Sequence, residues 1–221
     1  WGYPGEDTRG QPHAFTSELS IHVAVYETPT ALALHPLGFQ VAVILEDMLR
    51  IYHLTSQQVT RTLFDVSLKH PGDVAYSNGG NMLAVTSEND VILFDPWRSV
   101  LIHMFSGRGG HLSTVNQVLF SEDDRLLLSC SAAPHGAIYG WDLESETKER
   151  SLEHVSKGTS FACIAHDFRR QLVITCTRPE GNLRVISHAE SSHLDVPSEG
   201  RGCGYTTLCL AAPLGMLFAG T

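Results

Sequence analysis

The residues of this sequence that could do chemistry include its histidines. The chain has 12 of them, and imidazole serves both as a metal ligand and as a general base near neutral pH. His188 and His193, with Glu190 between them, come closest to a ligand cluster. A zinc site needs at least three protein ligands in fixed positions, and this Ser-rich segment offers no third fixed ligand. We therefore predict no metal site and no cofactor.

Other short segments resemble catalytic motifs only in part. Residues 67–70 and 106–111 combine Ser or Gly with a basic residue, as nucleophile and phosphate-binding loops do. Such loops lie between a strand and a helix, and neither segment has a helical pattern beside it. Asp123 and Asp124 form a carboxylate pair, but they occupy a turn between apolar strands, where Asp is common for local hydrogen bonds. Because no catalytic set can be placed, we predict that the chain is not an enzyme.

These residues sit on a regular frame of short strands. An apolar strand, a polar turn, a second apolar strand, a polar loop and a third apolar strand recur about every 45 residues. A weaker outer strand follows each copy, at residues 59–66, 101–105, 148–152 and 193–196. Four short strands in a repeat of this length are typical of a β-propeller blade. The sequence therefore predicts an all-β propeller with almost no helix.

The repeats also predict the organisation of the chain. They lie near residues 30–66, 73–105, 115–152, 160–196 and 205–221. A seven-bladed propeller needs roughly 300 residues, so we expect about four to five blades of such a ring, a partial propeller over 18–221. Residues 1–17, rich in Gly, Pro and charge, predict a loop or linker, and residues 19–26 the outer strand of a preceding blade.

Composition narrows the classes of partner. The net charge of −9 argues against nucleic-acid binding, which needs a basic surface. The five Cys lack CxxC spacing. Four of them, Cys130, Cys163, Cys176 and Cys209, lie inside apolar strands and are interpreted as reduced thiols, which favours a cytoplasmic location. The uncharged runs 28–45 and 205–221 each contain Pro and a Gly turn. We interpret them as pairs of strands and predict no membrane span.

One blade carries a recognisable polar pattern. His111 precedes the first strand of the third repeat, Ser129 lies in the second strand, and Trp141 and Asp142 end the third. The pattern resembles WD repeats, in which His, Ser and Trp at these places form a hydrogen-bonded set with a turn Asp. Residues 132–136 contain no Asp. We predict that His111, Ser129, Trp141 and Asp142 are a structural set of a degenerate WD-repeat chain.

Several segments, in order, resemble one ciliary family. They are residues 33–41 with 47–51, 120–128 with 136–143, and 205–207 with 216–221. Their order and spacing resemble a propeller of the cilia- and flagella-associated protein 57 family over residues 28–221, whereas 106–114 and 188–204 diverge. The resemblance implies a scaffold of the motile axoneme, with tandem propellers and a coiled coil. It also implies partners among axonemal and microtubule-associated complexes, including the inner dynein arms anchored on doublet microtubules.

Loops on a rigid frame are where binding residues usually lie. The candidate partner-contact residues are Lys69, Arg108, His111, His135, Lys157 and Arg178. Because a fold does not choose a function, two other classes stay open. One is a generic adaptor, such as a ubiquitin-ligase receptor or a chromatin-associated reader, which a basic or aromatic rim would favour. The other is a propeller hydrolase, which would need convergent carboxylates or histidines at the central channel.

Overall fold

The computed structural model of the chain describes residues 28–54, 58–63, 68–188, 192–197, 204–211 and 214–220. The predicted linker at 1–17 and the predicted strand at 19–26 lie outside the described residues. Strands make up most of the described part, in which a short 3-10 helix, η1 (Gly107–Gly109), joins the second blade to the third. The prediction of an all-β chain with almost no helix is confirmed.

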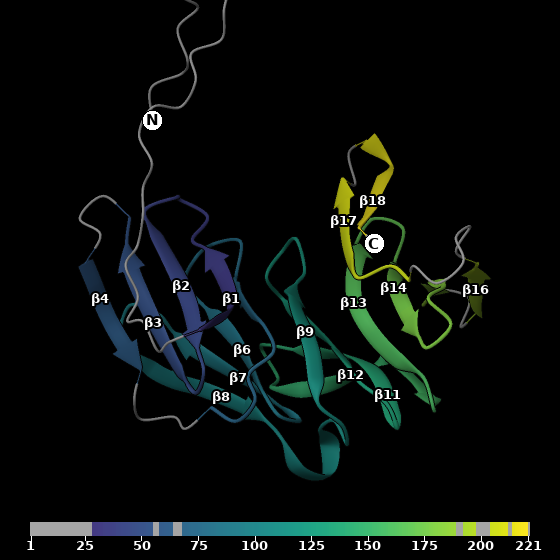
Figure 1. Ribbon diagram of the computed structural model, residues 1–221, viewed down its shortest axis with the longest axis horizontal. Coiled ribbons are helices and arrows are strands. Elements are labelled where there is room, and N and C mark those ends of the chain that lie inside the picture. Colours follow the sequence, from purple (N-terminus) through teal and green to yellow (C-terminus); the bar gives the residue numbers. More distant parts are fainter. Residues whose placement is uncertain are drawn as a thin grey trace, which may run out of the picture.

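Four antiparallel sheets of four strands follow one another along the described chain (Figure 1). We number them as blades. Blade 1 contains β1 (Pro29–Leu34), β2 (Gln40–Leu45), β3 (Met48–His53) and β4 (Gln58–Leu63). Blade 2 contains β5 (Val74–Tyr76), β6 (Leu83–Ser87), β7 (Asp90–Asp95) and β8 (Val100–Phe105). Blade 3 contains β9 (Val115–Phe120), β10 (Leu126–Ser131), β11 (His135–Asp142) and β12 (Thr147–Lys157). Blade 4 contains β13 (Ser160–Asp167), β14 (Leu172–Arg178), β15 (Leu183–Ser187) and β16 (Ser192–Val196), and a further pair follows, β17 (Thr207–Ala211) with β18 (Met216–Gly220).

The blades are arranged as in a propeller. The first strands of successive sheets, β1, β5, β9, β13 and β17, contact one another, so they form the inner wall. The last strand of each four-stranded sheet is its outer edge. The prediction of four strands per repeat is therefore confirmed for four blades, with the strand bounds shifted by a few residues.

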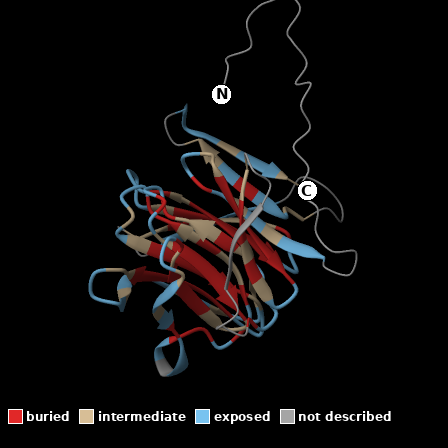
Figure 2. Cartoon of the chain, turned by 90° about the vertical axis from the view of Figure 1, so that its left-hand side faces the viewer, coloured by how far each residue is buried: buried red, intermediate tan, exposed pale blue. Residues whose placement is uncertain are grey.

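The core lies between the blades rather than within one of them. β2, β6 and β10 are buried on both faces, which explains why they read as unbroken apolar runs (Figure 2). Separate apolar clusters fill successive seams: Ile51 packs with Phe94 between blades 1 and 2, and Leu128 packs with Phe161 between blades 3 and 4. Each blade thus buries its faces only against its neighbours, as repeat architectures do.

The cysteines follow this pattern with one exception. Cys130, Cys163 and Cys176 are free thiols in buried strand positions, as predicted. Cys209 was predicted to be buried as well, but it is exposed. It lies on β17, whose sheet has only β18 as a partner in the described part of the chain, so one face of that strand has little to pack against.

Polar side chains repeat the blade period in space. The imidazole Nε2 of His35 lies 3.1 Å from the carbonyl oxygen of Gly80, 45 residues later. Asp124 accepts hydrogen bonds from the backbone N–H and the side-chain amide of Asn78 at 2.7 and 2.8 Å, and from Gly79 N–H at 2.7 Å. Each bond joins corresponding parts of adjacent blades. We call the Asn78–Asp124 group the blade 2–3 clasp.

The clasp makes a testable prediction about stability. Asp124 has a positive φ of 55°, a conformation that Asn also tolerates, so Asp124→Asn keeps the turn while replacing one acceptor oxygen by an amide donor. We expect a loss of about 1 kcal/mol in the free energy of unfolding, because one clasp N–H loses its acceptor. Urea denaturation measures it. Glu122→Gln, in the same turn but outside the clasp, is the control; an equal loss in both variants would contradict the prediction.

Candidate functional site

The predicted polar set of blade 3 comes together in the structure. Trp141 donates its indole N–H to Ser129 Oγ at 2.8 Å, and His111 Nε2 lies 2.6 Å from the same oxygen. All three side chains are buried. Because an indole N–H can only donate, Ser129 Oγ accepts from Trp141 and can give its own proton to His111. In that arrangement the ring proton of His111 sits on Nδ1.

The missing turn Asp has a visible consequence. His111 Nδ1 is buried and has no hydrogen-bond partner among the described residues. The turn that lacks an Asp, between β10 and β11, therefore leaves one polar atom of the set unsatisfied, which costs free energy. Burial, with the nearby Lys148 charge as a smaller contribution, lowers the pKa of His111 to about 3. The ring is neutral at physiological pH.

The set joins blade 3 to blade 2. The indole of Trp141 stacks on Phe105 of β8 with ring centroids 4.7 Å apart. Tyr139 lies 4.5 Å from the ring of His111, and the Lys148 ammonium sits 3.4 Å from the Tyr139 ring centroid, a cation–π contact. These contacts make the set an anchor of the seam. His111 itself is buried among these side chains.

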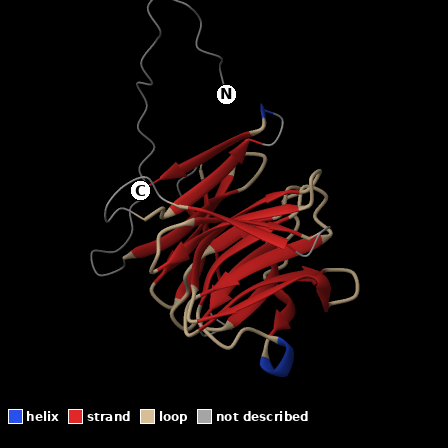
Figure 3. Cartoon of the chain, turned by 90° about the vertical axis from the view of Figure 1, so that its right-hand side faces the viewer, coloured by secondary structure: helices blue, strands red, loops and turns tan. Residues whose placement is uncertain are grey.

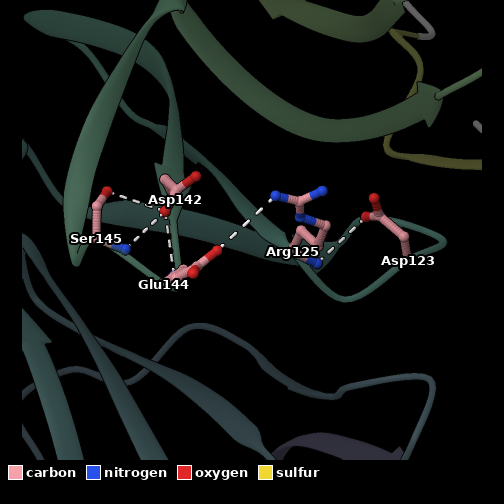
Figure 4. Close-up of polar contacts among 5 residues, drawn as sticks. All are labelled: Asp123, Arg125, Asp142, Glu144 and Ser145. Atoms are coloured by element: carbon pink, nitrogen blue, oxygen red, sulfur yellow. Dashed lines mark hydrogen bonds and ion pairs between the residues drawn. The ribbon is translucent and has the colours of Figure 1, made fainter.

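Asp142 lies apart from this set, contrary to the prediction. Its Oδ1 accepts hydrogen bonds from the backbone N–H groups of Glu144 and Ser145 and from the Ser145 hydroxyl (Figure 4). Asp123 does the same in its own turn, accepting from the N–H of Arg125. An Asp that follows a strand caps the next turn, so Asp142 and Asp123 are both explained by turn structure.

Five of the predicted contact residues share one rim. In an antiparallel blade the turn between the second and third strands lies on the same side as the loop to the next blade (Figure 3). We call this side the exit rim. It carries Lys69 before β5, Arg108 in η1, His135 at the start of β11, Lys157 at the end of β12 and Arg178 at the end of β14.

The exit rim carries exposed basic side chains over blades 3 and 4, with the exposed Glu180 in the same β14–β15 turn as Arg178. His135 and Lys157 are direct partners across β11 and β12, and Arg178 pairs with Ser160, three residues beyond Lys157. All three side chains are exposed. Lys69 is also exposed, whereas the side chain of Arg108 lies outside the described residues. Against a net charge of −9, such a patch favours an acidic partner surface.

His111 lies in the loop from β8 to β9, but its side chain is not on the surface of this rim. The prediction that it is an exposed contact residue is wrong, because its side chain is only 1% exposed. A loop position does not reveal that the ring turns inward to meet Ser129 and Tyr139.

The remaining histidines form no metal centre in the described part of the chain, where no three His, Cys, Asp or Glu side chains are suitably grouped. His188 donates its Nδ1–H toward the Ser151 carbonyl at 2.9 Å, and His193 packs against His154 with ring centroids 5.7 Å apart. Glu190 lies outside the described residues. Within those residues no helix has the length and apolar character of a membrane span.

The fold and the polar set define the class of protein: a β-propeller with one recognisable WD-type blade. The particular relatives are ciliary. The chain is 25% identical over 210 residues to cilia- and flagella-associated protein 57 of Mus musculus, covering 93% of this chain. It is 29% identical over 230 residues to cilia- and flagella-associated protein 57 C of Tetrahymena thermophila, covering 92% of this chain. These relatives confirm the resemblance that the sequence predicted.

The likeness covers a small part of each ciliary relative. The chain spans 16% of the length of each ciliary relative. No family model matches it. Among solved structures, the hydrazine synthase of Kuenenia stuttgartiensis superposes with a TM-score of 0.76 at 14% identity, covering 96% of this chain and 65% of that chain. At this identity the likeness shows the fold alone.

Proposed function

We propose that the chain is part of a non-catalytic interaction scaffold of the motile cilium or flagellum. It would sit on the axonemal cytoskeleton and help to anchor or regulate inner dynein arms on doublet microtubules. The observation that carries the proposal is the similarity to two ciliary proteins over more than nine tenths of the chain. A rigid ring of blades that presents loops on two rims suits a scaffold.

The exit rim supplies the contact surface in this proposal. Lys157 and Arg178 lie on adjacent blades and carry charge that repels an approaching basic protein and attracts an acidic one. The polar set of blade 3 acts only by holding the frame, since its groups are buried and engaged with one another. No step of the proposed function needs catalysis or a cofactor.

Fractionation of flagellated cells tests the proposal. The full-length protein is tagged, membranes and matrix are removed with detergent, and the tag is followed. We expect retention on the axoneme with release only at high salt. Lys157→Glu with Arg178→Glu should be released at lower salt, and Arg98→Glu with Arg169→Glu on the opposite rim is the control. Release of the wild type into the soluble or nuclear fraction would replace the proposal with a generic adaptor.

A further inference from the structure

The seam between blades 3 and 4 contains a cavity that the proposed scaffold role does not use. It has a volume of about 260 Å³ and opens to solvent. Glu149 and Leu152 of β12 line one side, and Leu126 of β10 lies beside them. His166 and Phe168 of blade 4 line the other side, and His188, after β15, lies between. Apolar side chains fill the buried parts of the seams, this one included, whereas the cavity is lined in part by the polar side chains of Glu149, His166 and His188.

A bulge in β12 opens this cavity. Gly140 of β11 pairs with Glu149, whereas Ile138 pairs with His154, so residues 150–153 have no opposite partners. Leu152 turns over Gly140, where an added Cβ would lie 2.5 Å from the Leu152 methyl carbon Cδ1. Gly is therefore required there for the bulge. Bulges of this kind re-aim side chains beside functional sites.

His188, which lines both this cavity and the adjoining one, carries an unused hydrogen-bond acceptor. His188 Nδ1 lies 2.9 Å from the carbonyl oxygen of Ser151, and a carbonyl can only accept, so the ring proton is on Nδ1. Burial lowers the pKa of His188, which keeps the ring neutral. Its Nε2 is then a lone-pair acceptor, and it is buried with no partner among the described residues. Such an atom is satisfied by an occupant that brings a donor.

The β12 side of the cavity carries negative charge. Glu149 Oε1 accepts hydrogen bonds from the N–H and hydroxyl of Ser151 at 3.1 and 2.8 Å, which holds the pKa of Glu149 below its usual range. Its second oxygen has no partner among the described residues. Glu122 and Asp123 act on the nearby His166 ring, adding negative potential. No Lys or Arg is among the described residues that line this cavity, although Arg150 lines the adjoining one.

We propose that this cavity binds the cationic side chain of a lysine or arginine from a partner protein. The ammonium or guanidinium group donates to Glu149 and to His188 Nε2. Leu126 and Leu152 cover the methylene stem, as apolar surfaces do for long basic side chains. Phe168, which is 38% exposed, offers its ring to the cation. A lysine side chain has five heavy atoms, roughly 150 Å³ at about 30 Å³ each, so it fits. The proposal does not depend on a ciliary location.

Binding of a capped amino acid to the purified chain tests this site. The probe is Nα-acetyl-lysine methylamide, and the signals are the ring protons of His188 and His166 in NMR spectra. We expect saturable shifts of both rings. Nα-acetyl-norleucine methylamide, which has the stem without the ammonium, should shift neither. This comparison uses only the wild-type chain, so it does not depend on the folding of a variant.

Matched variants test whether the Glu149 charge and the Phe168 ring contribute to binding. Glu149→Gln should weaken lysine binding about fivefold, since it removes a partly exposed charge partner. Glu144→Gln, a similarly acidic residue in the turn before β12 and outside the cavity, should leave binding unchanged. Phe168→Leu should weaken binding roughly twofold to fivefold by removing a cation–π contact. Equal shifts with norleucine, no saturable shift with lysine, or equal effects of Glu149→Gln and Glu144→Gln would each overturn the proposal.

Discussion

Replacing Ser129 by alanine is expected to lower the free energy of unfolding by about 2–4 kcal/mol. Ser129 Oγ is fully buried and holds both Trp141 Nε1 and His111 Nε2. Without it, two buried polar atoms lose their only partners among the described residues, and each costs about 1–3 kcal/mol. His111 would then have no partner for either ring nitrogen, since Nδ1 already has none among the described residues. Urea denaturation at pH 7.5 measures the loss.

Two further variants test whether the loss of stability is specific to the Ser129 hydroxyl. Ser145→Ala removes a serine hydroxyl from an exposed turn of the same blade, so it should cost no more than about 0.5 kcal/mol. Ser129→Thr keeps the hydroxyl oxygen and should recover part of the stability, with the added methyl group limiting the recovery in a closely packed site. A Ser129→Ala loss as small as that of Ser145→Ala would show that the set contributes little to blade 3.

The sequence predicted the frame because the frame is repetitive. Strands buried on both faces give continuous apolar runs, and the about 45-residue period repeats the blade. The resemblance to WD repeats predicted the joining of His111, Ser129 and Trp141, which lie before β9, in β10 and in β11. The prediction was wrong for Asp142, which ends β11 and caps the turn that follows, where its carboxylate accepts from Glu144 and Ser145 instead of joining the set.

The candidate sites were less predictable because they join distant residues. Asn78 and Asp124 look like ordinary turn residues until blades 2 and 3 lie side by side. The lysine cavity depends on Glu149 and His188, and its shape depends on a bulge that only the register of β11 and β12 reveals. Gly140 lies inside a strand, where Gly often marks a bulge. It was the one signal in the sequence that could have suggested this bulge.

Acidification is expected to destabilise the chain through His111. The pKa of this ring is about 3 in the folded protein and 6.5 as the ordinary value, because burial opposes its charged form. Between these pH values the unfolded chain binds a proton that the folded chain does not. Stability is therefore fully present above about pH 6.5 and falls as the pH falls toward 3. From pH 7.5 to 4 the loss from this group is about 3 kcal/mol.

Other groups titrate in the same pH range, so the test compares the unfolding free energy of the wild type with that of a variant without the His111 ring. Burial raises the pKa of Asp73 to about 6, so between this value and 3.8 the folded state holds the extra proton and acid stabilises it. The pKa of the half-buried His154 is lowered to about 4, which acts in the same direction as His111. Both groups remain in His111→Gln, whose amide oxygen can still accept a hydrogen bond from the Ser129 hydroxyl but does not titrate. Their contributions cancel when the two proteins are compared.

The unfolding free energy of the wild type should therefore fall by about 3 kcal/mol more than that of His111→Gln between pH 7.5 and 4. Urea denaturation at intervals of pH gives both curves. Parallel curves would mean that the protonated ring finds an acceptor at Nδ1 in solution, at the turn where the WD-type Asp is missing. The set would then be complete without an Asp. Diverging curves would instead identify His111 as the neutral, incompletely satisfied member of the set, in the seam between blades 2 and 3.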